Sequence, residues 1–229
     1  GKARTRYMPA EMGGAEAFIK IYEETLVMVK EVEQLTINPA DYAYEITKTG
    51  KRDDSVVNHR IHRQKQEGLY YVEYHPVGGD ANVANLLAAL DYAVTLDQVE
   101  ARIAPDQSLY FINLTADEAR KIANLTDDSA INEFRRSVSC VGSTVCQIGI
   151  QDSNGLLKAI FTHLEEKGVD TRKLPRLHIS GCPHSCGTHQ IGEIGFHGSV
   201  KLVDKKPTTS FMLVDGGSEH MGSENFGKM

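Results

Sequence analysis

The sequence predicts an α+β protein, and three observations lead to this fold class. Helical periodicity recurs in separate stretches, at residues 14–36, 82–94 and 152–167. Short β-branched or aromatic runs lie between and after these stretches, bounded by glycine, proline or polar residues. A polar run, Thr126–Ser129, separates two groups of such elements. We therefore expect three parts, residues 1–55, 56–126 and 127–229.

The first part, residues 1–55, is expected to hold one amphipathic helix over residues 14–36 that ends before Pro39. Residues 37–55 have mixed extended character, and Lys51–Asp54 is expected to form an exposed turn. The apolar residues of the helix recur every three or four positions and predict a packing face, made of Phe18, Ile19, Tyr22, Leu26, Val29 and Val32.

The second part, residues 56–126, has the pattern of a small α+β unit. The aromatic run Leu69–Tyr74 predicts a strand, and Val77–Gly79 a loop. Apolar residues 83, 86, 87, 90 and 94 predict a helix over 82–94. Strands are expected at 99–103 and 109–114. Thr115–Glu118 is a capping box that opens a helix to Leu125.

The third part, residues 127–229, places strands directly before cysteines. A short strand at 135–139 is expected to deliver Cys140, and a strand at 177–180 to deliver Cys182. Between them, Asp152–Asn154 caps a helix that runs to about Lys167 and is closed by Gly168. Further strands are expected at 194–203 and 210–214.

The four cysteines form two local pairs, Cys140 with Cys146 and Cys182 with Cys186. Unrelated buried thiols and two disulfides fit poorly with such tight, glycine-flanked pairs in a chain of this size. A zinc site is the main rival, although C-x5-C departs from its usual spacing. An iron–sulfur cluster held by four thiolates suits both pairs, and glycines 142, 181 and 187 allow a close backbone approach. A helical turn between Cys182 and Cys186 would place both sulfurs on one face.

Residues Ser180–Phe196, S-G-C-x3-C-x6-E-I-G-F, together with the upstream C-x5-C, resemble the siroheme and iron–sulfur signature of the nitrite and sulfite reductase family. Weaker similarities are a basic amino-terminal segment, K-A-R-x-R-Y, and Q-K-Q-E-G at 64–68. The resemblance implies that Cys140, Cys146, Cys182 and Cys186 bind a 4Fe–4S cluster. It also implies that Cys186 bridges to the iron of siroheme.

The same resemblance implies a carboxy-terminal half-enzyme: a linker and helix (1–55), a ferredoxin-like half domain (56–126), and a cluster domain with a mixed sheet (127–229) that ends within a glycine-rich loop. Such an enzyme reduces sulfite to sulfide or nitrite to ammonia with six electrons. Its partners are the amino-terminal half and a ferredoxin or flavoprotein donor. The substrate-binding cations belong to the other half, so we expect no catalytic residue here and an inactive isolated fragment. A non-catalytic iron–sulfur electron-transfer module and a zinc-stabilised structural domain are the alternatives.

Two positions depart from related chains, which often carry Gly-Arg and Arg-x-Thr-x-x-Gln near the tetrapyrrole. This chain has Gly78–Gly79 and Asn113–Glu118 there. His178, His184 and His189 surround the second cysteine pair, and their roles stay open between structure and proton relay. A helical turn would point His184 away from the cluster.

Composition indicates an ordinary globular protein, with 41% hydrophobic and 24% charged residues. The net charge of −6 disfavours general nucleic-acid binding, and no apolar run approaches a membrane span. The basic residues Arg60, Arg63 and Lys65 are expected to form a solvated face. Reduced thiols and no secretory leader favour the cytoplasm.

Overall fold

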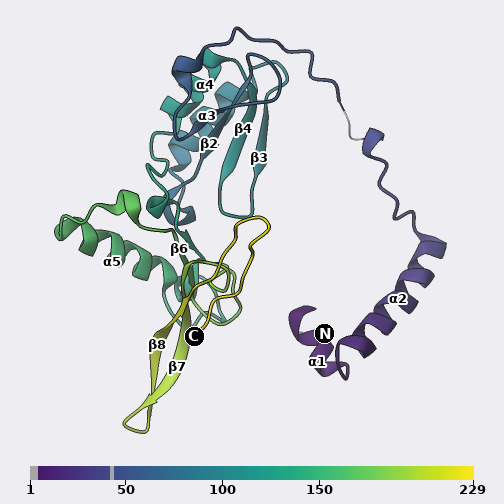
Figure 1. The fold of residues 1–229 in the computed structure, drawn as a ribbon, viewed down its shortest axis with the longest axis vertical. Coiled ribbons are helices and arrows are strands. Elements are labelled where there is room, and N and C mark those ends of the chain that lie inside the picture. Colours follow the sequence, from purple (N-terminus) through teal and green to yellow (C-terminus); the bar gives the residue numbers. More distant parts are fainter. Residues whose placement is uncertain (1–4, 42–43) are drawn as a thin grey trace. The chain divides into compact units, whose positions relative to one another are not determined.

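The structure is a computed structural model of the chain and describes residues 5–41 and 44–229. The start of the basic amino-terminal segment therefore lies outside the described residues. The chain divides into two compact units, residues 1–45 and 46–229. Each unit is described by itself below (Figure 1).

The first unit consists of two helices, α1 Met8–Glu11 and α2 Ala15–Val32, with a 3₁₀ turn at Pro39–Asp41. The predicted long helix is confirmed, but it ends at Val32, well before Pro39, where the backbone of Glu33 becomes extended. The expected packing face is only partly covered within the described part of this unit, where Phe18, Leu26 and Val29 are half-buried. No residue of α2 is buried there, and Ile19, Tyr22 and Val32 are 51%, 57% and 80% exposed.

The second unit begins with an antiparallel four-stranded sheet whose strand order is β1-β2-β4-β3. Helices α3 and α4 pack on this sheet (Figure 1). The buried core between them includes Val72, Phe111, Leu114 and Ile122. The elements are β1 Ile61–Arg63, β2 Tyr70–Tyr74, α3 Val83–Ala93, β3 Glu100–Ile103, β4 Leu109–Leu114 and α4 Ala116–Leu125.

Local signals predicted this first sheet well, with one correction. The capping box at Thr115 is present and opens α4 as expected. In α3, however, the buried residues are Ala89 and Ala93, whereas the predicted Val83 and Val94 are 67% and 81% exposed. The helix is turned so that its small residues face α4 and β3, because alanines allow a close approach of the backbones.

A second four-stranded sheet, of order β5-β6-β7-β8, carries the cysteine segments. β5, β6 and β7 are parallel and β8 is antiparallel to β7, which confirms the predicted mixed sheet. Helix α5 packs on it, and Phe134, Leu157, Phe161, Leu177 and Ile179 form its core. The elements are β5 Val138–Ser139, α5 Ser153–Glu166, β6 Leu177–Ser180, β7 Ile194–Val203 and β8 Lys206–Asp215.

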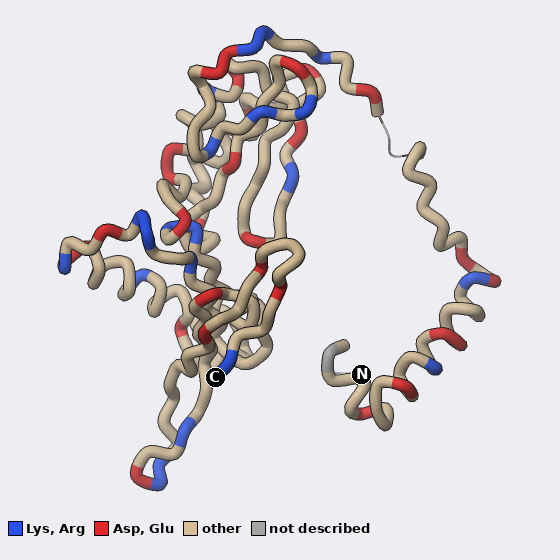
Figure 2. The backbone as a smooth tube through the Cα atoms, in the orientation of Figure 1, with Lys and Arg blue, Asp and Glu red and all other residues tan. Residues whose placement is uncertain are grey.

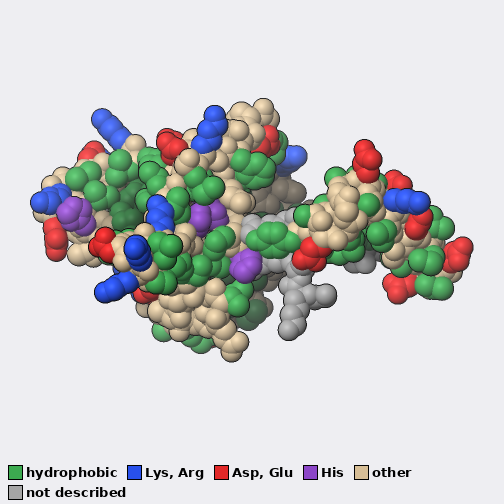
Figure 3. Space-filling view, turned by 90° about the horizontal axis from the view of Figure 1, so that it is seen from below, with side chains coloured by type: hydrophobic (Ala, Val, Ile, Leu, Met, Phe, Trp, Pro, Cys, Tyr) green, Lys and Arg blue, Asp and Glu red, His purple; other side chains and the backbone are tan. Residues whose placement is uncertain are grey.

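The β7–β8 hairpin extends beyond the rest of this sheet (Figure 1), because β6 pairs only with Ile194–His197. Lysines gather towards its tip (Figure 2), at positions 201, 205 and 206. Val200, Leu202 and Val203 are more than half exposed on it. The view from below shows apolar side chains beside basic ones on the second unit (Figure 3).

Hydrogen bonds join the two sheets where residues 126–137 pass between them. Ala130 N–H donates to His75 O at 2.9 Å, and His75 N–H donates to Ser129 Oγ at 3.0 Å. The polar run at 126–129 therefore lies between two sheets that form one compact unit. No helix among the described residues is long and apolar enough to cross a membrane.

Candidate metal centre

Backbone hydrogen bonds interlock the two cysteine-bearing segments, residues 140–151 and 180–187. Cys140 N–H donates to Ile179 O at 3.0 Å, and the N–H groups of Ile150 and Gln151 both donate to Gly181 O at 2.9 Å. Gly181 N–H donates in turn to Cys140 Sγ at 3.1 Å. A sulfur of the first pair thus accepts a hydrogen bond from the residue that precedes Cys182.

Glycines make this close approach possible. A Cβ on Gly181 would lie 2.5 Å from Gln151 O and 3.0 Å from Gly142 Cα. A Cβ on Gly142, whose φ is +65°, would lie 2.7 Å from Ser153 N and Oγ. The sequence pointed to these glycines as positions where the backbone could approach a cluster closely. Their neighbours in the structure are backbone atoms of the two segments and Ser153 at the start of α5.

The four thiols differ in exposure: Cys182 is buried, Cys140 and Cys146 are half-buried and Cys186 is exposed. None forms a disulfide, which removes that alternative. Within the described residues, no three His, Cys, Asp or Glu side chains lie close enough together to hold a metal ion as they stand. The fold therefore fixes the two segments against each other without closing the sulfurs into a finished ligand set.

The turn between Cys182 and Cys186 is not helical, contrary to the interpretation that placed both sulfurs on one helix face. Residues 181–190 form bends and turns, and Ser185 has a φ of +61°. Because the helix is absent, His184 does not point away from the cysteines. Its Nδ1 lies 3.4 Å from Cys182 Sγ.

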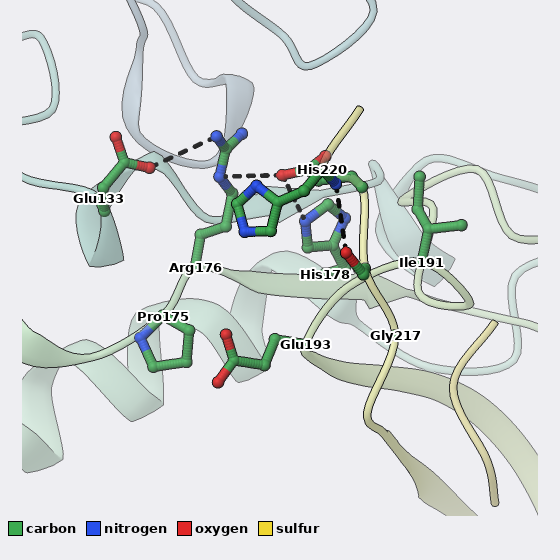
Figure 4. A pocket seen from close by; sticks show the side chains of 10 residues that line it. Glu133, Pro175, Arg176, His178, Ile191, Glu193, Gly217 and His220 are labelled. Carbon is green, nitrogen blue, oxygen red and sulfur yellow. Dashed lines mark hydrogen bonds and ion pairs between the residues drawn. The ribbon is translucent and has the colours of Figure 1, made fainter. Parts of the chain in front are cut away.

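Behind this turn, a cavity of about 210 Å³ holds charged side chains (Figure 4). Arg176 makes ion pairs with Glu133 Oε2 at 3.4 Å and Glu219 Oε1 at 3.3 Å. His178 Nε2 lies 3.8 Å from the same Glu219 oxygen. Burial lowers the pKa of His178, and Arg176 lowers it further, while Glu219 opposes both. His178 is therefore a buried, neutral imidazole near pH 7.

The ion-pair network around Arg176 extends to the first sheet through Arg136. Arg136 pairs with Glu73 of β2 and with Glu133, both at 2.8 Å, and with Asp106 at 3.4 Å. Burial raises the pKa of Glu73, and the Arg136 charge opposes that shift. Sequence reasoning missed this network, because its members come from distant segments and have no common spacing. It connects the first sheet to the strand that leads into Cys182.

At the positions that differ from related chains, the residues make contacts within the first sheet and its helices. Asn113 is fully buried with a φ of +63°, and its Nδ2 donates to Gln98 O at 2.8 Å. Glu118 caps α4 and pairs with Lys48 at 2.7 Å. A Cβ on Gly79 would lie 2.7 Å from Gln107 Nε2. These residues stabilise the first sheet.

The expectation that three basic residues form a solvated face is wrong for Arg60. It is half-buried and donates to Glu73 O at 3.2 Å and Ala123 O at 3.1 Å, so it packs against the first sheet and α4. Arg63 and Lys65 are exposed, as expected.

No protein-family model matches this chain. A ferredoxin–nitrite reductase of Synechococcus elongatus is 30% identical over 176 residues, which are 72% of this chain and 34% of the relative. A sulfite reductase [NADPH] hemoprotein beta-component of Lysinibacillus sphaericus is 29% identical over 124 residues, 49% of this chain and 22% of the relative.

The solved structure of the Mycobacterium tuberculosis NirA protein superposes with a TM-score of 0.61 at 23% identity, covering 75% of this chain and 33% of that one. That likeness confirms the fold. The aligned part of the chain spans about a third or less of each of these relatives. Together with the cysteine segments, the curated relatives identify the family: the chain belongs to the nitrite/sulfite reductases.

Proposed function

We propose that this chain is the carboxy-terminal part of a siroheme-dependent reductase that reduces nitrite to ammonia or sulfite to sulfide. The observation that carries the proposal is the interlocking of the two cysteine segments through Gly181. A chain related to both nitrite and sulfite reductases brings all four of its cysteines onto these two segments.

The four cysteines fit an iron–sulfur cluster in kind and number, since such clusters are held by thiolates. Cys140, Cys146, Cys182 and Cys186 would hold a 4Fe–4S cluster, and the exposed Cys186 would also be the ligand shared with siroheme. When bound, the two cofactors supply single-electron transfer and an iron site for the substrate oxyanion.

The chain's own groups prepare the thiolates for this role. The N–H of Gly181 donates to Cys140 Sγ and so stabilises negative charge on that sulfur. Cys182 is buried, which keeps water from its side of the site, whereas Cys186 is an exposed residue on the side from which siroheme would approach. Cys140 and Cys146 are half-buried, so their exposure is intermediate between that of Cys182 and that of Cys186.

We further propose the division into a ferredoxin-like half domain over 56–126 and a cluster domain over 127–229. The cations that hold the anionic substrate would come from the amino-terminal part of the enzyme. The electron donor would be a ferredoxin, as for the nitrite reductase relative, or a flavoprotein that takes electrons from NADPH, the donor in the name of the sulfite reductase relative.

The test uses the complete protein that contains this chain, purified without oxygen. Reduced methyl viologen supplies electrons, and the oxidation of the dye is followed with nitrite and, separately, with sulfite. We expect turnover with at least one anion and a loss of about a hundredfold or more in Cys186→Ser. Gly168→Ala, a change in open space after α5, is the control and keeps its activity. Turnover with neither anion, or an active Cys186→Ser variant, would contradict the proposal.

A further inference from the structure

The residues that follow Cys186 are hydrogen-bonded back onto β6, the strand that leads into Cys182. Gly187 N–H donates to Ser180 Oγ at 3.0 Å. The Nδ1 atom of His189 lies 2.9 Å from the same hydroxyl, and the Nδ1 atom of His178 lies 2.8 Å from Thr188 Oγ1. Side chains of alternate β6 residues, 178 and 180, therefore bind three successive residues, 187–189. We call these contacts the exit latch.

The direction of one hydrogen bond of Ser180 is set by its partner. Its oxygen accepts the N–H of Gly187, which cannot accept in return. Ser180 is 1% exposed, so bulk water does not compete for its proton. We assign the Ser180 hydroxyl as the donor to His189 Nδ1, because this gives the buried hydroxyl proton an acceptor.

The latch packs tightly against β7 and the backbone of β6. His197 of β7 pairs in register with Ser180, and its ring centroid lies 4.7 Å from that of His189. His189 and His197 are 3% and 8% exposed. A Cβ on Gly187 would lie 2.0 Å from Ile179 O, and a Cβ on Gly195 would lie 2.0 Å from His189 O. Neither glycine position leaves room for a side chain.

Two residues in or next to the latch have unfavourable backbone conformations. Ser185 has a φ of +61° and Thr188 a φ of +52°. For a β-branched residue such as threonine this region is rarely occupied, and each such residue costs about 1–3 kcal/mol. Conformations of this kind persist only when surrounding contacts fix them. The Thr188 hydroxyl, bound to His178, is such a contact.

We propose that the exit latch positions Cys182 and Cys186 by closing the turn that carries them. Ser180 and His189 are its central pair, and both are positioning residues that act through the cysteines. The latch itself is a property of the fold, whereas its role in retaining a cluster rests on the proposed function.

The test compares variants of the complete protein. Ser180→Ala and His189→Leu remove the central hydrogen bond. His189→Asn restores an acceptor near the position of Nδ1 and is the rescue variant. Ser129→Ala is the matched control, because Ser129 is also buried and accepts a backbone N–H at 3.0 Å, but lies at the first sheet.

The first measurement is the alkylation rate of each cysteine by iodoacetamide in iron-depleted protein, resolved by peptide mass spectrometry. We expect Ser180→Ala and His189→Leu to raise the rate at Cys182 about tenfold relative to Cys140 in the same molecule. His189→Asn and Ser129→Ala should stay close to wild type. An unchanged ratio, or an equal rise in Ser129→Ala, would overturn the latch. If Ser180→Ala does not fold, the comparison of His189→Leu with His189→Asn decides.

The second measurement is the rate at which a chelator removes iron from the loaded protein, which we expect to rise about tenfold in the same two variants. Altered alkylation in a protein that binds no iron would support the latch and contradict the proposed function. If the protein binds iron but the variants change neither the alkylation rates nor the rate of iron removal, the result would support the proposed function and contradict the latch.

Discussion

Gly181→Ala tests whether the two cysteine segments must interlock. The added Cβ would lie 2.5 Å from Gln151 O and 3.0 Å from Gly142 Cα. Both distances are shorter than an ordinary contact of about 3.5 Å, so the segments must separate by up to about 1 Å. Both neighbours are backbone atoms, so no side-chain rotation can relieve the clash.

The energetic cost follows from these contacts. Overpacking a closely packed site costs about 1–3 kcal/mol. The separation also weakens the two hydrogen bonds to Gly181 O and the one to Cys140 Sγ, each worth about 0.5–1.5 kcal/mol. We therefore expect a loss of about 2–5 kcal/mol, a large part of the 5–15 kcal/mol that is typical for a domain.

Urea unfolding followed by circular dichroism gives this loss, and iron analysis of the same anaerobic samples shows whether the site survives. Gly168→Ala is the control: its φ is +64° and no atom lies within 4 Å, so it costs only about 1 kcal/mol of backbone strain. We expect Gly181→Ala to lose most of its iron and Gly168→Ala to keep it. A Gly181→Ala protein as stable and as rich in iron as the control would refute the reasoning.

Two further predictions concern buried charges. Burial lowers the pKa of His75 from 6.5 to about 4, so below pH 6.5 the unfolded chain takes up a proton that the folded chain refuses. The free energy of unfolding should fall by about 2 kcal/mol more in wild type than in His75→Asn between pH 7 and pH 5, as measured by urea unfolding; equal pH profiles would contradict this. Arg136→Met leaves the Glu73 carboxylate without its 2.8 Å partner and should cost about 3 kcal/mol in the same assay, whereas Arg172→Met at an exposed pair should be silent. An effect of Arg136→Met no larger than that of Arg172→Met would show that the network contributes nothing.

Local signals predicted the elements whose causes lie within a few residues. The capping box at Thr115 and the Asp152 cap opened helices where expected. β2 and β6 follow their β-branched and aromatic runs. β1, by contrast, is only Ile61–Arg63 and exists because it pairs with β2, a tertiary contact that no short run of residues can signal.

The candidate site shows the same limit. Spacing identified both cysteine pairs and the glycines between which the segments pack. It did not predict the non-helical turn at Ser185, because the residues that follow this turn, Gly187 and Thr188, are hydrogen-bonded to β6, a contact that arises only on folding. The ion pairs of Arg136 and the exit latch depend on residues brought together only by folding.

The most direct test of the account is the metal content of the complete protein, purified without oxygen and analysed for iron, acid-labile sulfide, zinc and tetrapyrrole. We expect about four iron and four sulfide per chain together with a tetrapyrrole, and loss of the iron when any one of Cys140, Cys146, Cys182 or Cys186 is replaced by serine. Stoichiometric zinc without sulfide, or iron that all four replacements leave in place, would contradict it.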